Sequence, residues 1–284
     1  MLLSLTPLRT RKYPDIPLEE QHCGQIDIIL HKLTEDILTW NKRIQNLVSF
    51  CDKSGTLLID HPYSVRGLVS RAKIADRLAA TLSGVVTLSG TAVRTPRYAV
   101  DTPQELTFPV IAKPLTAAGS KESHAMTVLL DPDAPHYPTD CIFQEYKNHG
   151  AILYKVYVIG QHVSVHERPS LPDLPPSTES RLDAVAFDSQ RQPYPGLREF
   201  GYAATTKSTT QSRLVLTAPQ LAPVVDALKR AFGLELFGFD LIYCGAALWV
   251  VDVNYFPSYK EVGNFPTLLA NVLAQTVVTA SHQR

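Results

Sequence analysis

The sequence predicts a mixed α/β and α+β protein, in which a small β-α-β unit precedes a larger region built mainly of antiparallel sheet. Two short apolar runs at 26–30 and 55–62 flank a segment with helical periodicity, which is typical of a parallel strand pair. Five further apolar runs between residues 108 and 169 have little helix between them, which favours antiparallel pairing. The runs 236–244 and 247–256 then form a hairpin.

The first third is expected to contain two strands and two helices. Apolar residues recur near a 3.6-residue period across 34–55, which predicts one helix that ends at Gly55. The following run, 55–62, is a strand stopped by Pro62. The segment 65–84 is predicted to be a second helix.

The rest of the chain alternates short strands with loops and two helices. Strands are expected at 108–115, 124–130, 140–146, 151–160 and 162–169. The proline-rich stretch 169–180 and the polar, aperiodic stretch 188–213 predict loops, the second of them long and mobile. Helices are predicted at 219–232, with Gly233 after it, and at 266–280.

Composition limits the classes of function. The 284 residues carry no formal net charge, so the chain is not a nucleic-acid binder by overall charge, and an anionic ligand needs a local cluster of cations. The sequence has no apolar run long enough for a membrane span. Cys23, Cys51, Cys141 and Cys244 have no metal-site spacing, which fits a reducing setting. We therefore expect a cytoplasmic monomer that acts on a small molecule.

Polar side chains interrupt the hairpin near one end. Asp252 and Asn254 share a face of the second strand because strand side chains alternate. Taken alone, such a pair is more often a polar strand end. Asp240 lies in the preceding strand, and three oxygen donors on one hairpin suit Mg2+ when phosphates supply its other ligands.

Two lysines also interrupt strands. A lone strand lysine, such as Lys113 or Lys155, is usually a solvated edge residue. Two of them, with the Gly-Ser pair of "AAGSKESH" after the first, favour a phosphate cradle instead. Neither the Walker pattern nor G-x-G-x-x-G is present.

Seven stretches follow one another along the chain: "HKLTEDIL", "DHPYSVRGLVSRAK", "FPVIAKPLTAAGSKESHAM", "FQEYKNHGAILYKVYVIG", "ERPSL", "LFGFDLI" and "VVDVNYFPSY". In this order they resemble the motifs of the inositol-tetrakisphosphate 1-kinases, also called inositol 1,3,4-trisphosphate 5/6-kinases, which have the ATP-grasp fold. This resemblance implies an N-terminal α/β domain at 1–68 and an ATP-grasp domain at 69–284, with subdomains at about 85–145 and 146–284. It also implies Mg2+-dependent transfer of the ATP γ-phosphate to a hydroxyl of an inositol polyphosphate.

The resemblance further implies a role for each matching residue. The implied ligands are ATP, a pair of Mg2+ ions and the inositol polyphosphate. The metal ligands would be Asp240, Asp252 and Asn254, and the catalytic groups Lys113, Lys155, Arg168 and His124. The residues implied to bind ATP are Arg71, Lys113, Gln144, Glu145, Tyr146, Lys155, Ser170 and Ser189. Those implied to bind the acceptor are Lys32, Gly119, His124, Lys155, Asn254 and Ser258, within a wider cationic set that adds Lys121, Lys147, His149 and His166.

The chain departs from the family pattern in three places, one of which is Ala118, where relatives often have a histidine or an acid. The family's first strand, which carries a substrate lysine, and its first helix have no counterpart, so the 1–68 domain is expected to be truncated. Ser258 replaces a frequent glycine, which adds a Cβ near the acceptor. Two other readings stay open: an ATP-grasp carboxylate–amine ligase, and a catalytically impaired relative that binds nucleotide or inositol phosphate.

Overall fold

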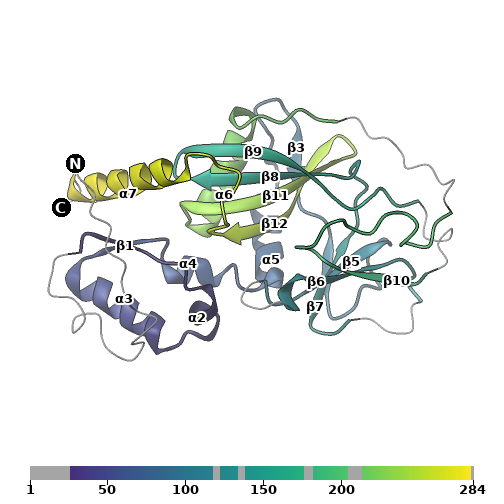
Figure 1. Cartoon of the computed structure of the whole chain (residues 1–284), viewed down its shortest axis with the longest axis horizontal. Coiled ribbons are helices and arrows are strands. Elements are labelled where there is room, and N and C mark those ends of the chain that lie inside the picture. Colours follow the sequence, from purple (N-terminus) through teal and green to yellow (C-terminus); the bar gives the residue numbers. More distant parts are fainter. Residues whose placement is uncertain (1–25, 118–121, 134–137, 176–181, 204–212, 283–284) are drawn as a thin grey trace.

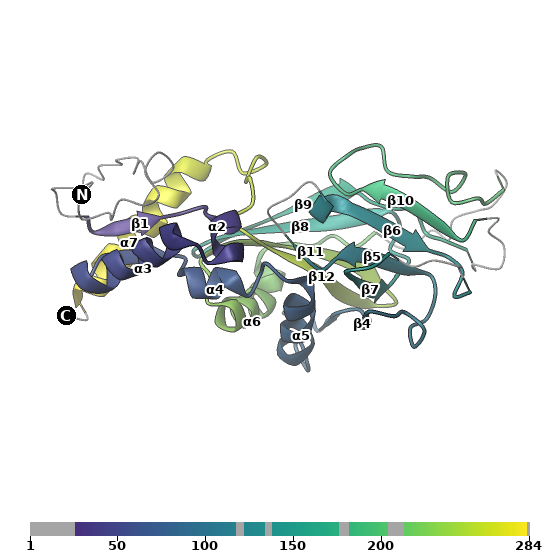
Figure 2. The same ribbon diagram turned by 90° about the horizontal axis from the view of Figure 1, so that it is seen from below.

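The computed structural model describes residues 26–117, 122–133, 138–175, 182–203 and 213–282. The expectations for the N-terminal segment before residue 26, for Ala118, Gly119 and Lys121, and for parts of the two predicted loops fall outside these residues. Figures 1 and 2 show the described elements from two directions.

The N-terminal unit contains the predicted parallel strand pair. Strand β1 (Ile28–Leu30) pairs in parallel with β2 (Leu57–Ile59). The prediction of a single helix between them is wrong, because the structure has two, α2 (Thr34–Thr39) and α3 (Lys42–Ser54). Helix α2 ends at Trp40, whose backbone is left-handed with φ 49°. Asn41 caps α3, since its side chain accepts hydrogen bonds from Arg43 N and Ile44 N. An apolar stripe continued across this break and concealed it.

The second predicted helix, 65–84, is also two helices. Helix α4 (Pro62–Arg66) is separated from α5 (Arg71–Thr81) by residues 67–70, a turn that ends in the extended residue Ser70. Ser70 bridges to Thr116, and Arg71 N, at the start of α5, donates to Leu115 O at 2.8 Å. The break therefore attaches the start of α5 to the chain that follows strand β5 (Val110–Pro114).

The antiparallel region forms two five-stranded sheets (Figure 1). The first sheet has the order β10-β6-β5-β7-β4 and is antiparallel throughout. Three strands of three to five residues were not predicted, because each is too short to show a clear alternation. The bounds in the first sheet are β4 (Tyr98–Val100), β5 (Val110–Pro114), β6 (Ala125–Leu129), β7 (Cys141–Glu145) and β10 (Ala184–Asp188).

The second sheet has the order β3-β12-β11-β8-β9, with β3 (Ala92–Arg94) parallel to β12 at its edge. Strands β8 (Ile152–Ile159) and β9 (His162–Pro169) form one hairpin, and β11 (Leu236–Cys244) and β12 (Ala247–Tyr255) form the predicted one. The two predicted C-terminal helices are confirmed as α6 (Ala222–Phe232), which follows one 3-10 turn, and α7 (Phe265–His282). Gly233 ends α6 in the left-handed conformation.

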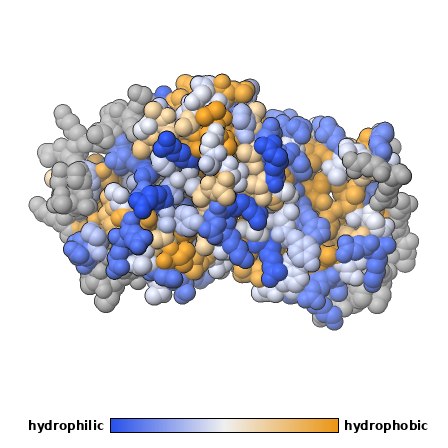
Figure 3. Space-filling model, turned by 180° about the vertical axis from the view of Figure 1, so that it is seen from behind, coloured by the Kyte–Doolittle hydropathy of each residue, from blue (hydrophilic) through white to orange (hydrophobic). Residues whose placement is uncertain are grey.

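The main core lies on one face of the second sheet. Alternate residues of the sheet, such as Val156, Phe239 and Val250, are buried there against α5 and α6. Because strand side chains alternate, Lys155, Asp240 and Asp252 belong to the other face. The face of the molecule opposite to Figure 1 intermingles hydrophilic and hydrophobic residues (Figure 3). Among the described helices, none has the length and apolarity that a bilayer crossing requires.

A buried carboxylate attaches the N-terminal unit to the second sheet. Asp60 follows β2 and is 4% exposed, and its two oxygens accept from Glu235 N at 2.7 Å and Leu236 N at 3.0 Å. His31 Nε2 donates to Asp60 O at 2.5 Å, and Tyr255 OH donates to His31 O at 2.7 Å. These contacts fix the end of the small sheet against the start of β11.

This anchor predicts a pH dependence of stability. Burial raises the pKa of Asp60 to about 7, above the roughly 3.9 expected in the unfolded chain. The folded state then holds the proton more tightly, so the stabilisation is complete below about pH 4 and is lost as pH rises through about 7. Between pH 5 and 7.5 we expect the free energy of unfolding to fall relative to that of Asp60→Asn, by at most about 1.4 kcal/mol per pH unit. Urea denaturation across this range measures it, and parallel profiles for the two proteins would contradict it.

Candidate active site

A row of charged side chains crosses the face of the second sheet that lies opposite the main core. Asp240 of β11 pairs directly with Asp252 of β12 on one side and with Lys155 of β8 on the other. Lys155 Nζ lies 3.1 Å from Asp240 Oδ1. Asn254 follows two residues after Asp252 and pairs with Gly238. The three oxygen-bearing residues predicted as metal ligands are therefore neighbours on one hairpin.

A β-bulge connects this row to the first sheet. The pairing of β11 with β12 shifts between Asp240 and Leu241, which leaves Val251 as the extra residue. Lys113, on β5 of the first sheet, donates from Nζ to Val251 O at 3.1 Å. Lys113 is thus brought beside the carboxylate row from the opposite sheet.

The electrostatics of the row are dominated by burial. Burial lowers the pKa of Lys113 to about 8, and nearby Arg71 adds to this, whereas Asp252 and Asp240 oppose it. Burial also raises the pKa of Asp240, and the adjacent Asp252 contributes in the same direction, while Lys155 and Lys113 oppose it. Two neighbouring carboxylates in a low-polarity environment are stabilised by a bound cation.

The donor set fits Mg2+ that is held partly by phosphate oxygens. Within the described residues, no group of three or more His, Cys, Asp or Glu side chains forms a complete metal cage. Two carboxylates and an amide are what a Mg2+ site requires when a nucleotide supplies the remaining ligands. Asp240, Asp252 and Asn254 are the residues that would hold it.

Arg71 lies in the site but is held by the backbone. Its guanidinium donates to Pro114 O at 2.6 Å, Thr116 O at 2.8 Å and Ser123 O at 2.9 Å, and it is 5% exposed. Burial lowers its pKa, which Asp252 opposes. Arg71 lines one small cavity together with Lys113, Gln144 and Asp252. Arg71 thus makes three hydrogen bonds to backbone carbonyl groups of this chain. Its geometry therefore assigns it first to positioning the segment after β5.

The predicted nucleotide hinge begins in β7. Gln144 is buried, and its Oε1 atom accepts no hydrogen bond from the residues that the structure describes. The backbone N–H groups of Glu145 and Tyr146 donate to Arg97 O and Pro109 O, at 3.0 and 2.9 Å. Adenine binding by this hinge stays a prediction, and it cannot use those two N–H groups as they stand.

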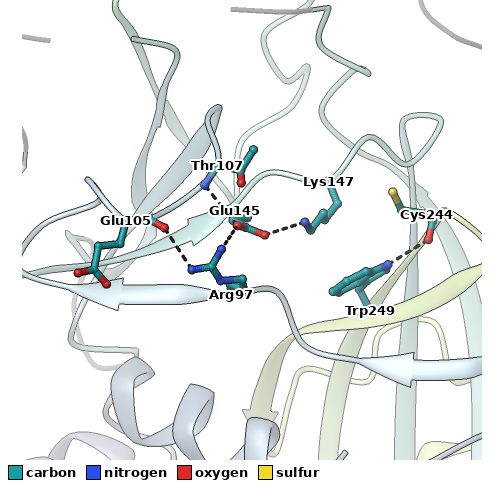
Figure 4. A network of polar contacts seen from close by, with 7 residues as sticks. All are labelled: Arg97, Glu105, Thr107, Glu145, Lys147, Cys244 and Trp249. Carbon is teal, nitrogen blue, oxygen red and sulfur yellow. Dashed lines mark hydrogen bonds and ion pairs between the residues drawn. The ribbon is translucent and has the colours of Figure 1, made fainter. Parts of the chain in front are cut away.

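Polar contacts hold the start of the hinge (Figure 4). Glu145 accepts from Lys147 Nζ at 2.7 Å and from Thr107 N at 3.2 Å, and Arg97 approaches it at 3.5 Å. Burial alone raises the pKa of Glu145, but these bonds bring that pKa below its usual value. Lys147 Nζ also lies 5.0 Å from the ring centre of Trp249 on β12. Lys147 therefore links the hinge to the second sheet rather than serving as a free cation.

His149 was expected to add positive charge, and the structure corrects this. It is 7% exposed, and its ring nitrogens lie 2.7 Å from Lys147 O and 2.8 Å from Ser170 Oγ. Burial lowers its pKa, so the imidazole is neutral at pH 7. Asp173 accepts from the N–H groups of His149 and Gly150, both at 2.7 Å. Ser170, a predicted ATP residue, is thus engaged in holding this turn.

His124 and Ser189 lie together where strand β6 begins and strand β10 ends. Ser189 N donates to His124 O at 2.9 Å, and the amide nitrogen of Gln190 lies 2.9 Å from His124 Nε2. Burial, and then Arg71, lower the pKa of His124. His124 is therefore a hydrogen-bonding group more than a cation, and Gln190, which no sequence pattern marked, orients it.

The predicted acceptor residues Lys32 and Ser258 have different surroundings. Lys32 Nζ lies 5.3 Å from the ring centre of Phe256, and burial lowers its pKa. Ser258 is exposed, and the left-handed residues of its turn are the neighbouring Phe256 and Tyr259. The added Cβ at 258 therefore meets no left-handed backbone.

Arg168 has partners that sequence reasoning missed. Its Nε donates to Glu261 Oε1 at 2.9 Å and its Nη2 lies 2.7 Å from Glu261 Oε2. Tyr157 OH donates to the same Oε2 at 2.7 Å. Glu261 lies in the turn after β12, and its spacing from other charged residues gave no signal of this contact.

Comparison with known proteins agrees with this arrangement. Residues 84–275 match the model of the inositol 1,3,4-trisphosphate 5/6-kinase ATP-grasp domain. Inositol-tetrakisphosphate 1-kinase 1 of Zea mays is 30% identical over 278 residues, covering 92% of this chain and 78% of its own. Inositol-tetrakisphosphate 1-kinase 4 of Oryza sativa subsp. indica is 31% identical, covering 90% of this chain and 72% of its own.

Among solved structures, the D-alanine–D-alanine ligase of Bacillus anthracis has a similar fold. It aligns with a TM-score of 0.52 at 12% identity, covering 98% of this chain and 87% of that protein. This likeness confirms the predicted ATP-grasp fold and says nothing of the reaction. The family match over most of the chain confirms the resemblance found in the sequence motifs. This chain belongs to the inositol 1,3,4-trisphosphate 5/6-kinase family of ATP-grasp proteins.

Proposed function

We propose that this protein is a Mg2+-dependent kinase that transfers the ATP γ-phosphate to a hydroxyl group of an inositol polyphosphate. The observation that carries the proposal is the meeting of Lys113, from one sheet, with the Asp240–Asp252 pair of the other. ATP-grasp ligases use a similar arrangement, so the acceptor class rests on family membership together with the cations Lys155 and Arg168.

Catalysis is assigned to positioning and charge. Asp240, Asp252 and Asn254 would hold Mg2+, in our proposal two ions, whose charge neutralises the β- and γ-phosphates. Lys113 and Lys155 provide fixed ammonium groups beside the phosphates. The transition state of phosphoryl transfer is loose, so a strong general base is not required.

The remaining residues are assigned to the two ends of the site. Gln144, Glu145, Tyr146 and Ser170 lie along the proposed nucleotide hinge, and Ser189 beside His124. Arg168 and His124 orient the acceptor, with Lys32 and Ser258 near the turn after β12. We further propose that residues 69–284 form the ATP-grasp domain and that the protein works as a cytoplasmic monomer.

A turnover assay tests the proposal. Purified protein is incubated with γ-labelled ATP, Mg2+ and either inositol 1,3,4-trisphosphate or inositol 3,4,5,6-tetrakisphosphate, and products are separated by anion exchange. We expect acceptor-dependent ADP formation and a product with one more phosphate. Inorganic phosphate release that depends on a carboxylate and an amine would instead identify a ligase. Stabilisation by ATP and Mg2+ without turnover on either acceptor would identify a non-catalytic relative.

A further inference from the structure

Arg168, which the proposed function assigns to the acceptor, is already paired with an acidic side chain, that of Glu261. Glu261 binds Arg168 through both carboxylate oxygens, at 2.9 and 2.7 Å. This two-point geometry is the one that a guanidinium also offers to a phosphate group. Glu261 therefore stands in the position that a phosphate oxygen pair would take on Arg168.

The Arg168–Glu261 pair lies on the same face of the second sheet as Lys155, Asp240 and Asp252. Arg168 and His166 share a face of β9, and His166 pairs with Lys155, which contacts Asp240. The Tyr157 ring packs against the His166 ring with centroids 5.5 Å apart. The Arg168–Glu261 pair is therefore continuous with the row of charged residues that ends at the metal ligands.

The strength of the pair suits exchange with a ligand. The side chains of Arg168 and Glu261 are 38% and 29% exposed, so solvent and a ligand can reach both. Ion pairs this exposed contribute little to stability. A dianionic phosphate can displace the carboxylate, but it must first compete with it. Burial alone raises the pKa of Glu261, yet hydrogen bonds from Arg168 and Tyr157 lower it, so the competitor is charged at pH 7.

We infer that Glu261 is a specificity-determining residue, which competes with an acceptor phosphate for Arg168 and weakens the binding of inositol polyphosphates. The inference rests on the proposed function and goes beyond it. Acceptors that place a phosphate group at Arg168 must displace Glu261, whereas acceptors without one leave the pair intact. ATP binding does not involve this exchange.

Glu261→Gln tests this inference, because glutamine keeps the size and a hydrogen-bond acceptor for Tyr157 but loses the charge. Binding of inositol 1,3,4-trisphosphate is measured by calorimetry without nucleotide, and KM values for acceptor and ATP by turnover. We expect the acceptor Kd and KM to fall about three- to tenfold, with the KM for ATP unchanged. Removing the guanidinium by Arg168→Gln should abolish the gain that Glu261→Gln brings.

Glu167→Gln is the matched control. Glu167 precedes Arg168 on β9, points to the other face of the strand, and pairs with exposed Arg213. The Glu167→Gln variant should therefore bind the acceptor with the same affinity as the wild type. If Glu261→Gln binds the acceptor no more tightly than the wild type does, this inference is overturned while the proposed function stands. Glu261 would then be a residue that positions Arg168. Failure of both wild type and variant to bind the acceptor would overturn the proposed function with it.

Discussion

Asp252→Asn is expected to lower kcat by about 10^2–10^3-fold while leaving the fold intact. Asp252 is one of the two directly paired carboxylates, and the amide that replaces it cannot neutralise a divalent cation. The adjacent Asp240 has its pKa raised by burial and also by Asp252, so the substitution relieves a repulsion. We therefore expect the melting temperature to stay within a few degrees.

Steady-state turnover with Mg2+ varied up to saturation measures this effect. Asp226→Asn, which changes an exposed aspartate of α6, serves as the control and should retain full activity. Activity of Asp252→Asn that recovers fully at high Mg2+ would mean that the residue contributes only to metal affinity. Unaltered activity at all Mg2+ concentrations would remove Asp252 from the metal site.

Lys113→Met is expected to reduce kcat/KM for ATP by about 10^2–10^3-fold without loss of stability. Lys113 is 7% exposed and donates to Val251 O, and burial already lowers its pKa to about 8. The lowered pKa shows that burial makes the charged form of Lys113 costly in the folded state, and an uncharged side chain of similar length removes that cost. The melting temperature of the variant should therefore equal or exceed that of the wild type.

Lys73→Met, on an exposed position of α5, is the control for the loss of a lysine. Lys113→Arg should not restore activity, because the wider guanidinium has no room at a buried position between two sheets. If Lys113→Met were inactive and also strongly destabilised, the loss would reflect the junction of the sheets rather than phosphate binding. Calorimetric binding of ATP to the variant separates these cases.

The sequence was sufficient to predict the hairpin that carries Asp240 and Asp252, because long alternating strands leave a clear periodic signal. It also predicted that Lys113 belongs with them. The breaks at Trp40 and before Arg71 were missed, since apolar spacing continues across both. Glu261 was beyond reach, because its contact with Arg168 joins residues 93 positions apart.

The extra residue in β12 limits how this chain can vary over evolution. Val250 and Val253 both belong to the core although three positions separate them, which a regular strand does not permit. Gaining or losing one residue here would rotate the acidic and amide side chains into the apolar interior. Position 251 itself contributes a carbonyl to Lys113, so many side chains are acceptable there while the spacing is not. Related sequences should therefore show substitution at 251 and an invariant length on either side of it.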